Sequence, residues 1–295
     1  MNWDWIYRDE RRVLDSATRA GADGSFVNLP DGCTHYQLGG PEPADPVVLV
    51  HGFSVPYFIW DPTFDALTAA GCRVLRYDQF GRGYSDRPNT RYNIELFVRQ
   101  LHDLLDTLGL RKVDLIGLSM GGAVSSAFTV EYPECVRTLV LIDPIGTEPY
   151  RPNLIYRLAL IPGVSELLLS MVSTQSIVDA FARDFFDPAE VERYREPYRA
   201  QVQFKGFRRA ILSTVRNKVV DGFPAVYERL GKLEIPVLLI WGKEDRTLPI
   251  AQSESIRRLV PRADFRAIEH AGHVPHAEQP GIVHPMILEF LNSND

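Results

Sequence analysis

Short, nearly continuous runs of apolar residues alternate along the chain with longer segments in which apolar residues recur every three or four positions. The runs occupy residues 47–50, 72–77, 113–118, 137–142 and 237–241. Runs of this kind, rich in β-branched residues, are typical of strands that are covered on both faces, as in a parallel sheet. They therefore predict the central strands of such a sheet.

The segments between these runs have the spacing of amphipathic helices. In residues 94–108, apolar side chains fall at 94, 97, 98, 101, 104, 105 and 108, which places them in one stripe. Gly109 follows directly, at a position where helices commonly end. Because strands alternate with helices, we predict an α/β fold with a mostly parallel, doubly wound sheet. Further helices are expected at 123–132 and 282–291, and a last strand at 264–268.

The alternation of strands and helices stops in the middle of the chain. Between Pro144 and Lys232 no strand is predicted, and helical patterns occupy residues 155–161, 164–172, 177–186, 191–204 and 207–215. The alternation resumes after Pro236, so a helical insertion into one α/β domain explains the pattern better than two consecutive domains. We predict a first core part at 1–143, a helical cap at 144–232 and a second core part at 233–295.

Composition and charge exclude several classes of function. The chain has 295 residues, of which 45% are hydrophobic and 24% charged, and its net charge of −6 offers no basic surface for nucleic acid. The three cysteines lack the spacing of a disulfide framework or a zinc site and fit a reducing compartment. No apolar run reaches the roughly 18 residues of a membrane span, and the start does not resemble a signal peptide. We expect a soluble, cytoplasmic protein, whose oligomeric state the sequence leaves open.

The strongest chemical signal is the segment at residues 117–122, which reads GLSMGG. It fits the pattern G-x-S-x-G, and it lies between a predicted strand and a predicted helix. In this context the pattern predicts a nucleophile elbow, a sharp turn that raises the Ser119 hydroxyl above the carboxyl ends of the strands. The alternative is a glycine-rich turn with an incidental serine, but the position between strand and helix favours the nucleophile.

A nucleophilic serine needs a base, usually a histidine that a carboxylate orients. We predict His273, which lies in a loop bounded by Gly272 and Pro275, between the last predicted strand and the closing helix. His270 and His276 are close enough in sequence to be alternatives.

Asp245 is the predicted acid, because it follows the run at 237–241 and gives the chain order Ser119, Asp245, His273. Asp143, at the end of the run 137–142, is the alternative acid. Its competing interpretation is a strand-end residue that caps the loop into the helical insertion.

The negative oxygen that forms during acyl transfer must be held by donors already in place. We predict the backbone N–H of Met120, directly after Ser119, and the backbone N–H of Phe53, in the loop after residues 47–50. Gly52 lets the backbone of this loop pass close to a substrate. His51 is interpreted as a structural residue beneath the loop.

The chain resembles the α/β-hydrolase superfamily in motifs that occur in the family's order, which are HGF at 51–53, DQFGRGYSDRP at 78–88, GLSMGG at 117–122, GKED at 242–245 and GH at 272–273. The resemblance covers about residues 30–295, and the helical insertion falls where this family carries its cap. It implies the α/β-hydrolase fold and the triad Ser119, Asp245 and His273. It also implies that residues 78–88 form a structural loop with a buried pairing between Asp and Arg.

Within this superfamily, Ser119 stands where the relatives that open epoxides or remove halides have aspartate. Hydrolases of carbon–carbon bonds usually have a glycine-rich run after His-Gly, where this chain has FSVP at 53–56. The resemblance therefore implies a serine carboxylesterase, similar to monoacylglycerol lipases, that hydrolyses small to medium acyl or aryl esters through an acyl-enzyme without metal or cofactor. The alternatives are a hydrolase of aromatic ring-cleavage products that breaks a carbon–carbon bond, and a ligand-binding protein with slow turnover.

Apolar residues of the predicted cap favour an acyl- or aryl-binding pocket. They are Leu154, Ile155, Leu158, Leu160, Ile161, Leu167, Leu168, Leu169 and Met171. The competing interpretation is that most of them simply pack the cap onto the sheet.

Overall fold

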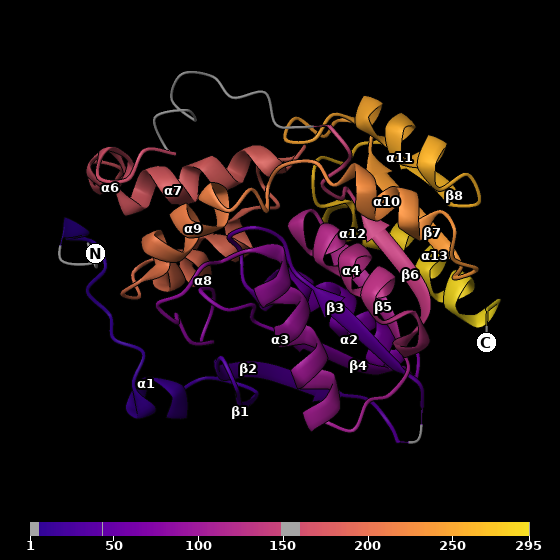
Figure 1. Ribbon diagram of the computed structural model, residues 1–295, viewed down its shortest axis with the longest axis horizontal. Coiled ribbons are helices and arrows are strands. Elements are labelled where there is room, and N and C mark those ends of the chain that lie inside the picture. The colour runs from indigo at the N-terminus through magenta and orange to yellow at the C-terminus, as the bar shows by residue number, and fades with distance from the viewer. Residues whose placement is uncertain (1–5, 43, 149–159, 295) are drawn as a thin grey trace.

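A computed structural model of the chain describes residues 6–42, 44–148 and 160–294. Its centre is an eight-stranded sheet in the order β1-β2-β4-β3-β5-β6-β7-β8, with helices on both faces (Figure 1). The strands are β1 (Ser25–Leu29), β2 (Gly32–Gly39), β3 (Pro46–Val50), β4 (Arg73–Tyr77), β5 (Val113–Leu118), β6 (Val136–Ile142), β7 (Val237–Gly242) and β8 (Asp264–Ile268). From β4 to β8 along the sheet, all neighbouring strands are parallel. The predicted mostly parallel α/β sheet is confirmed.

Helices flank the sheet, and the sequence analysis predicted those at 94–108, 123–132 and 282–291 and several in the segment between β6 and β7. The helices are α1 (Ser16–Ala20), α2 (Asp61–Ala69), α3 (Ile94–Thr107), α4 (Met120–Glu131), α6 (Val164–Ser170), α7 (Thr174–Phe181), α8 (Glu192–Val202), α9 (Phe207–Arg216), α10 (Pro224–Leu230), α11 (Ser253–Leu259), α12 (Pro275–Glu278) and α13 (Pro280–Asn292). Helices α3, α4 and α10 pack together on one face, and α2, α12 and α13 pack together on the other. No helix among the described residues has both the length and the apolar character needed to cross a bilayer.

Helix α3 shows how the apolar stripe fixes a helix against the sheet. The Asn93 side chain accepts a hydrogen bond from the Leu96 N–H at its start, and the chain turns away at Gly109 with φ 70°. Phe97, Leu101 and three more members of the stripe are buried in the core, and the two end members, Ile94 and Leu108, are partly buried against it. Each such side chain contributes about 1.5–3 kcal/mol by burial.

The sequence analysis did not predict β1 and β2. These strands form an antiparallel hairpin at one edge, in which Leu29 pairs with Gly32, and β2 joins the main sheet antiparallel to β4. Polar residues such as Thr34 and His35 interrupt their apolar pattern, and both are buried by packing that the local sequence does not reveal. A strand of this kind depends on its neighbours more than on its own composition.

The segment between β6 and β7 is helical, and α6 to α9 lie beyond the carboxyl end of the sheet (Figure 1). The predicted helices at 164–172, 177–186, 191–204 and 207–215 correspond to α6, α7, α8 and α9, while α10 was not predicted. The predicted helix at 155–161 falls largely on residues 149–159, outside the described part of the chain. The exact division into core and cap at residues 144 and 232 stays a prediction.

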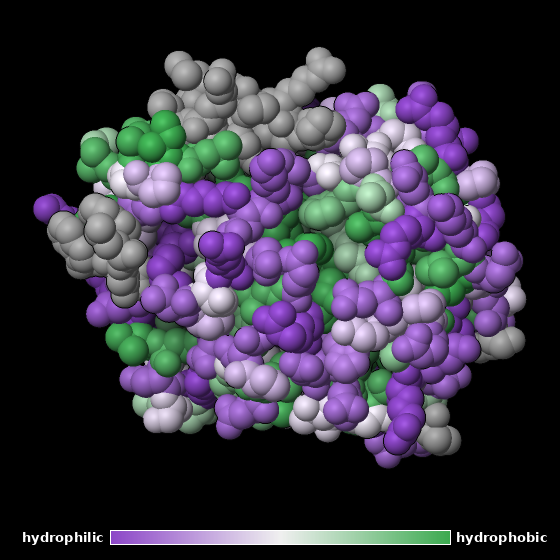
Figure 2. Space-filling model, viewed as in Figure 1, coloured by the Kyte–Doolittle hydropathy of each residue, from purple (hydrophilic) through white to green (hydrophobic). Residues whose placement is uncertain are grey.

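Helix α6 presents an apolar surface to the outside. Several exposed large apolar side chains gather on and around it, where Figure 2 shows hydrophobic atoms at the upper left: Leu160, Ile161, Val164, Leu167, Leu168 and Met171. Most of the predicted pocket residues that are described therefore lie on the surface. Leu169 is the member of that set that lines the cavity described below.

Candidate active site

Ser119 lies on a strained turn between β5 and α4. Its backbone has φ 55° and ψ −118°, a conformation that a residue with a side chain rarely adopts and that costs about 1–3 kcal/mol. Glycines make the turn possible, since a Cβ at Gly121 would lie 2.1 Å from the Val50 carbonyl oxygen and one at Gly117 would lie 2.5 Å from the Gly121 oxygen. The G-x-S-x-G pattern thus forms a tight turn between strand and helix.

The loop after β8 brings His273 to Asp245, which follows β7. The His273 Nδ1 and Asp245 Oδ2 atoms are 2.7 Å apart, and both side chains are buried. The other Asp245 oxygen accepts from the backbone N–H groups of Thr247, at 2.7 Å, and Leu248, at 2.9 Å. These bonds fix the carboxylate, so the histidine ring is oriented with its Nε2 atom free of the acid.

The charges of this pair stabilise one another. Burial opposes the charged form of His273, but the Asp245 carboxylate outweighs it and raises the pKa of His273 above its ordinary value. Burial also opposes the ionised form of Asp245, yet the neighbouring His273 and the hydrogen bonds to the carboxylate lower the pKa of Asp245. Asp245 is therefore an anion at neutral pH, as the orienting acid of a histidine base must be.

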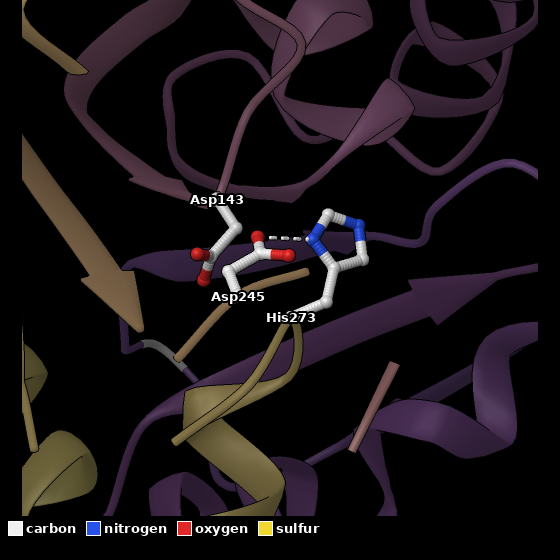
Figure 3. A group of neighbouring side chains, drawn as sticks. All are labelled: Asp143, Asp245 and His273. Atoms are coloured by element: carbon white, nitrogen blue, oxygen red, sulfur yellow. Dashed lines mark hydrogen bonds and ion pairs between the residues drawn. The ribbon is translucent and has the colours of Figure 1, made fainter. Parts of the chain in front are cut away.

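Asp143 lies at the end of β6, beside this pair (Figure 3). It is fully buried, and its Oδ1 atom accepts from the Gly242 N–H at 3.0 Å. Its backbone has φ 41°. The histidine is hydrogen-bonded to Asp245 rather than to Asp143, which had been the alternative acid.

Asp143, Asp245 and His273 also form a group whose ligand atoms all lie within 4.8 Å of one another. Three such atoms could in principle hold a metal ion. Hydrogen bonds already join His273 to Asp245 and Asp143 to the Gly242 N–H. The His273–Asp245 bond and the Gly242–Asp143 bond thus already occupy one oxygen of each carboxylate and the histidine Nδ1 atom.

Ser119 and His273 line the same cavity, which has a volume of about 390 Å³. Within the described residues no hydrogen bond joins the two side chains, a bond that in many enzymes tightens only when substrate is present. Helices from the segment between β6 and β7 supply much of the wall, with Leu169, Val172, Ile177, Phe181, Tyr198 and Phe207. The cavity lining is mostly apolar and includes the nucleophile candidate and the histidine.

The loop after β3 borders the cavity on the side of Ser119. Gly52 lies so close that a Cβ there would be 3.4 Å from the Ser119 Cβ. Arg82 is buried and donates from Nε to the Phe53 carbonyl oxygen at 2.8 Å, which fixes the loop. The Phe53 N–H has no acceptor in the described part of the chain, and the Met120 N–H is at the first position of α4, where helices leave N–H groups unpaired. Neither predicted donor therefore forms a hydrogen bond within the described residues, so both N–H groups are available to a substrate oxygen.

His51 has a structural environment. It is fully buried, its Nε2 atom accepts from the Gln79 N–H at 2.9 Å, and its Nδ1 atom lies 2.9 Å from the Gly52 carbonyl oxygen. Burial lowers the pKa of His51 to about 4, so the ring is neutral.

The two alternative histidines lie elsewhere. His270 packs its ring against Phe186, and His276 is buried against Trp60 with a pKa that burial lowers to about 3. Neither residue lines the cavity that holds Ser119.

The expected buried pairing between Asp and Arg in residues 78–88 is wrong for Asp78. This carboxylate pairs with His35, whose Nδ1 atom lies 2.7 Å away, and accepts from the Tyr57 and Tyr84 N–H groups. Arg82 bonds neutral oxygens instead, including the Phe53 carbonyl. His35 comes from β2, which the sequence analysis missed, so its partner could not be foreseen.

Asp184 and Thr247 also face the cavity and were not predicted. The Thr247 hydroxyl donates to the Asp184 carboxylate at 2.6 Å, and the Asp184 carbonyl oxygen accepts from the His273 N–H at 2.7 Å. Burial raises the pKa of Asp184. These bonds tie the segment after α7 to the histidine loop, and no local sequence signal marks a contact between positions so far apart.

Several known proteins are similar to this chain in sequence or in fold. A 2-hydroxy-6-oxo-2,4-heptadienoate hydrolase of Pseudomonas putida is 29% identical, over 85% of this chain and 90% of that protein. An uncharacterized carboxylesterase of Bacillus subtilis is 28% identical, over 91% of this chain and 86% of that protein. The solved structure of a meta-cleavage product hydrolase from Pseudomonas fluorescens superposes with a TM-score of 0.78 at 23% identity, covering 92% of this chain and 98% of that one.

The family model of the alpha/beta hydrolases matches residues 47–284, which include the loop after β3, the strained serine turn and the histidine loop. The sheet and its helices have the α/β-hydrolase fold of the solved neighbours. On this evidence the chain belongs to the alpha/beta hydrolase family.

Proposed function

We propose that this hydrolase is a serine carboxylesterase that acts on small to medium acyl or aryl esters. The observation that carries the proposal is the 2.7 Å bond between His273 and Asp245 in the cavity that Ser119 lines. A strained serine, a histidine of raised pKa and an ionised carboxylate are the parts that nucleophilic acyl transfer requires. The carboxylesterase among the relatives supports the same assignment.

In the proposed reaction, the Ser119 Oγ atom attacks the ester carbonyl while His273 Nε2 takes the hydroxyl proton. Asp245 holds the His273 Nδ1–H and stabilises the imidazolium. The Phe53 and Met120 N–H groups bind the oxyanion, and His273 returns the proton to the alcohol as the carbon–oxygen bond breaks. Water then attacks the acyl-enzyme by the same steps, which releases the acid and restores Ser119.

The lining of the cavity supports a substrate with an apolar acyl or aryl group. Leu169, Ile177 and Phe181 contribute apolar surface, and burial of such groups is favourable by about 25 cal/mol per Å².

The Ser119→Ala variant tests the nucleophile. We expect it to lower kcat for p-nitrophenyl butyrate by at least about 10,000-fold, with an unchanged melting temperature. Ser176→Ala is the matched control, because Ser176 lines the same cavity away from the turn and its loss is expected to leave kcat within about threefold. Hydrolysis by Ser119→Ala at the wild-type rate contradicts the proposal.

A second candidate is hydrolysis of a carbon–carbon bond in an aromatic ring-cleavage product. It is favoured by the Pseudomonas putida relative, a dienoate hydrolase. Wild-type protein should be assayed with 2-hydroxy-6-oxo-2,4-heptadienoate beside esters of graded chain length. A kcat/KM for the dienoate at least tenfold above every ester supports this candidate over the carboxylesterase. Covalent labelling by a fluorophosphonate without turnover of any substrate supports a ligand-binding protein instead.

A further inference from the structure

Asp143 is a buried carboxylate that the proposed reaction does not use. One of its oxygens accepts from the Gly242 N–H at 3.0 Å. The other, Oδ2, receives no N–H or O–H donor in the described part of the chain. Its side chain instead contacts the Asp245 carboxylate, at the back of the pair that Asp245 forms with His273 (Figure 3).

Two buried carboxylates with oxygen atoms within 4.8 Å of each other oppose each other's ionisation, which favours a proton on one of them. The bonding partners decide which residue carries it. Asp245 accepts from the His273 ring and from the Thr247 and Leu248 N–H groups, all of which stabilise an anion. Of the described residues, only Gly242 donates a backbone N–H to Asp143.

The surrounding charges also favour a proton on Asp143 and an ionised Asp245. Burial raises the pKa of Asp143 well above its usual range, and the negative charges of Asp245 and, further away, Glu278 on α12 add to the effect. His273, the cationic partner in this region, is bonded to Asp245. No basic side chain of the described residues forms an ion pair with Asp143.

We propose that Asp143 is a neutral carboxylic acid that donates its hydrogen to Asp245 and so holds that carboxylate in line with His273. The proton stays on Asp143 throughout, and no bond to substrate is involved. Asp143 is thus a positioning residue, and the proposal rests on the proposed roles of Ser119, His273 and Asp245.

The backbone does not explain why an acid is at this position. Asp143 has φ 41°, in the left-handed region, where glycine has no penalty and asparagine is tolerated as well as aspartate. Two substitutions therefore separate the side chain from the backbone. Asp143→Asn keeps a neutral donor of the same shape, and Asp143→Gly removes the side chain at a backbone that suits glycine.

The test measures the rate at which a fluorophosphonate labels Ser119 in the full chain, as a function of probe concentration and pH. We expect Asp143→Asn to label within about threefold of the wild-type rate, with the acid limb of its pH profile unchanged. Asp143→Gly should lower the maximal labelling rate about 10–100-fold, leave the half-saturating concentration unchanged, and shift or broaden the low-field proton resonance of His273 Nδ1–H. Thermal unfolding verifies that each variant is folded.

Three results overturn the inference. If Asp143 is ionised, Asp143→Asn removes a charge near His273 and moves the acid limb down by about one pH unit. If Asp143→Asn labels as slowly as Asp143→Gly, a neutral donor is not sufficient. If Asp143→Gly matches wild type in rate and in the Nδ1–H resonance, the side chain has no positioning role.

Labelling also separates this inference from the proposed function. A wild-type protein that is labelled at Ser119 but hydrolyses no ester contradicts the carboxylesterase, while the comparison of Asp143→Asn with Asp143→Gly still decides the role of Asp143. Labelling that persists in Ser119→Ala contradicts the nucleophile itself and overturns both proposals.

Discussion

The carboxyl edge of the sheet and helix α6 approach the same cavity, but they bury their polar groups in different ways. At the sheet edge, Asp143, Asp245 and His273 follow β6, β7 and β8, which are neighbouring strands. Backbone N–H groups donate to both carboxylates, and His273 is hydrogen-bonded to Asp245. Here the polar groups are placed by elements that the core already holds rigid.

Helix α6 buries polar side chains and exposes apolar ones, the reverse of a typical surface helix. Ser165 and Glu166 are 1% and 6% exposed, whereas Leu167 and Met171 are 56% and 72% exposed. Glu166 forms a two-pronged ion pair with Arg216 of α9, with both N–O distances at 2.7 Å. A polar clamp, rather than an apolar stripe, fastens this helix to the rest of the protein.

The difference indicates a division of work between the two regions. The groups that the proposed reaction needs in a fixed geometry lie at strand ends, where a small displacement would lower the rate. The helices mainly shape the cavity wall. Substitutions at the sheet edge should therefore change the rate of reaction, and substitutions in the helices should change which substrate fits or how stable the protein is.

The largest effect is expected from Asp245→Asn at the sheet edge. An amide cannot stabilise the imidazolium and favours the wrong tautomer, so kcat should fall about 10,000-fold. The control is Asp264→Asn, since this exposed carboxylate on β8 pairs with Arg266 at the surface. A kcat within tenfold of wild type for Asp245→Asn would contradict the assignment of the reaction rate to the sheet edge, because the rate would then not depend on the strand-end acid.

The same variant predicts a change in pH dependence. In wild type the raised pKa of His273 places the acid limb of kcat/KM above pH 6.5, the ordinary value of histidine, because activity requires the neutral ring. Loss of the Asp245 charge lowers the pKa of His273, so the limb of any residual activity moves to lower pH. A profile of kcat/KM from pH 5 to 9 measures the shift, and a limb that stays in place contradicts it.

An intermediate effect is expected where α6 reaches the cavity. Leu169→Trp places extra volume beside the predicted acyl group, so kcat/KM for p-nitrophenyl octanoate should fall about 10–100-fold, with that for the acetate changed less than threefold. Leu167→Trp is the matched control on the same helix, at an exposed position. Equal loss with both esters would show that α6 affects the chemistry as well as the fit.

The smallest effect is expected from Glu166→Gln in the polar clamp. Weakening the ion pair with Arg216 should lower the free energy of unfolding by about 1.5 kcal/mol, while Leu167→Gln should change it by less than about 0.5 kcal/mol.

The stability that Glu166 contributes should also depend on pH. The Arg216 hydrogen bonds lower the pKa of Glu166 to about 2. The contribution of Glu166 is therefore present above about pH 4.3 and is lost as the pH falls toward the folded-state pKa. Denaturant unfolding at pH 7 and pH 3 measures both differences.

Local sequence signals were sufficient for much of the fold and for the placement of Ser119 and His273, which line the cavity. The run at 113–118, the glycines around Ser119 and the helix that follows form one continuous unit, so its turn could be predicted from neighbours in sequence. His273 and Asp245 could be predicted as strand-end residues, because parallel strands end at one edge of a sheet. Their catalytic roles stay predictions until the variants are measured.

Other features depend on contacts between distant segments. Strand β2, which the sequence analysis missed, places His35 against Asp78 in the position expected for an arginine. On and around α6, the apolar residues were predicted to line the pocket. The ion pair between Glu166 and Arg216 holds the polar side of this helix inward, so most of the apolar side chains face outward. The pattern of apolar residues does not reveal which face of a helix packs against the protein when a polar contact holds that helix in place.

The sequence by itself determined the α/β architecture, the strained serine turn and the order of the three candidate catalytic residues, because these follow from apolar periodicity and from glycines near in sequence. Only the tertiary structure decided which acid lies against His273 and which acid lies behind it. The physical reason is that the charge of a buried carboxylate depends on the groups around it. For Asp245 the deciding partner is His273, and for Asp143 it is the Gly242 N–H, and both come from other strands or loops of the chain.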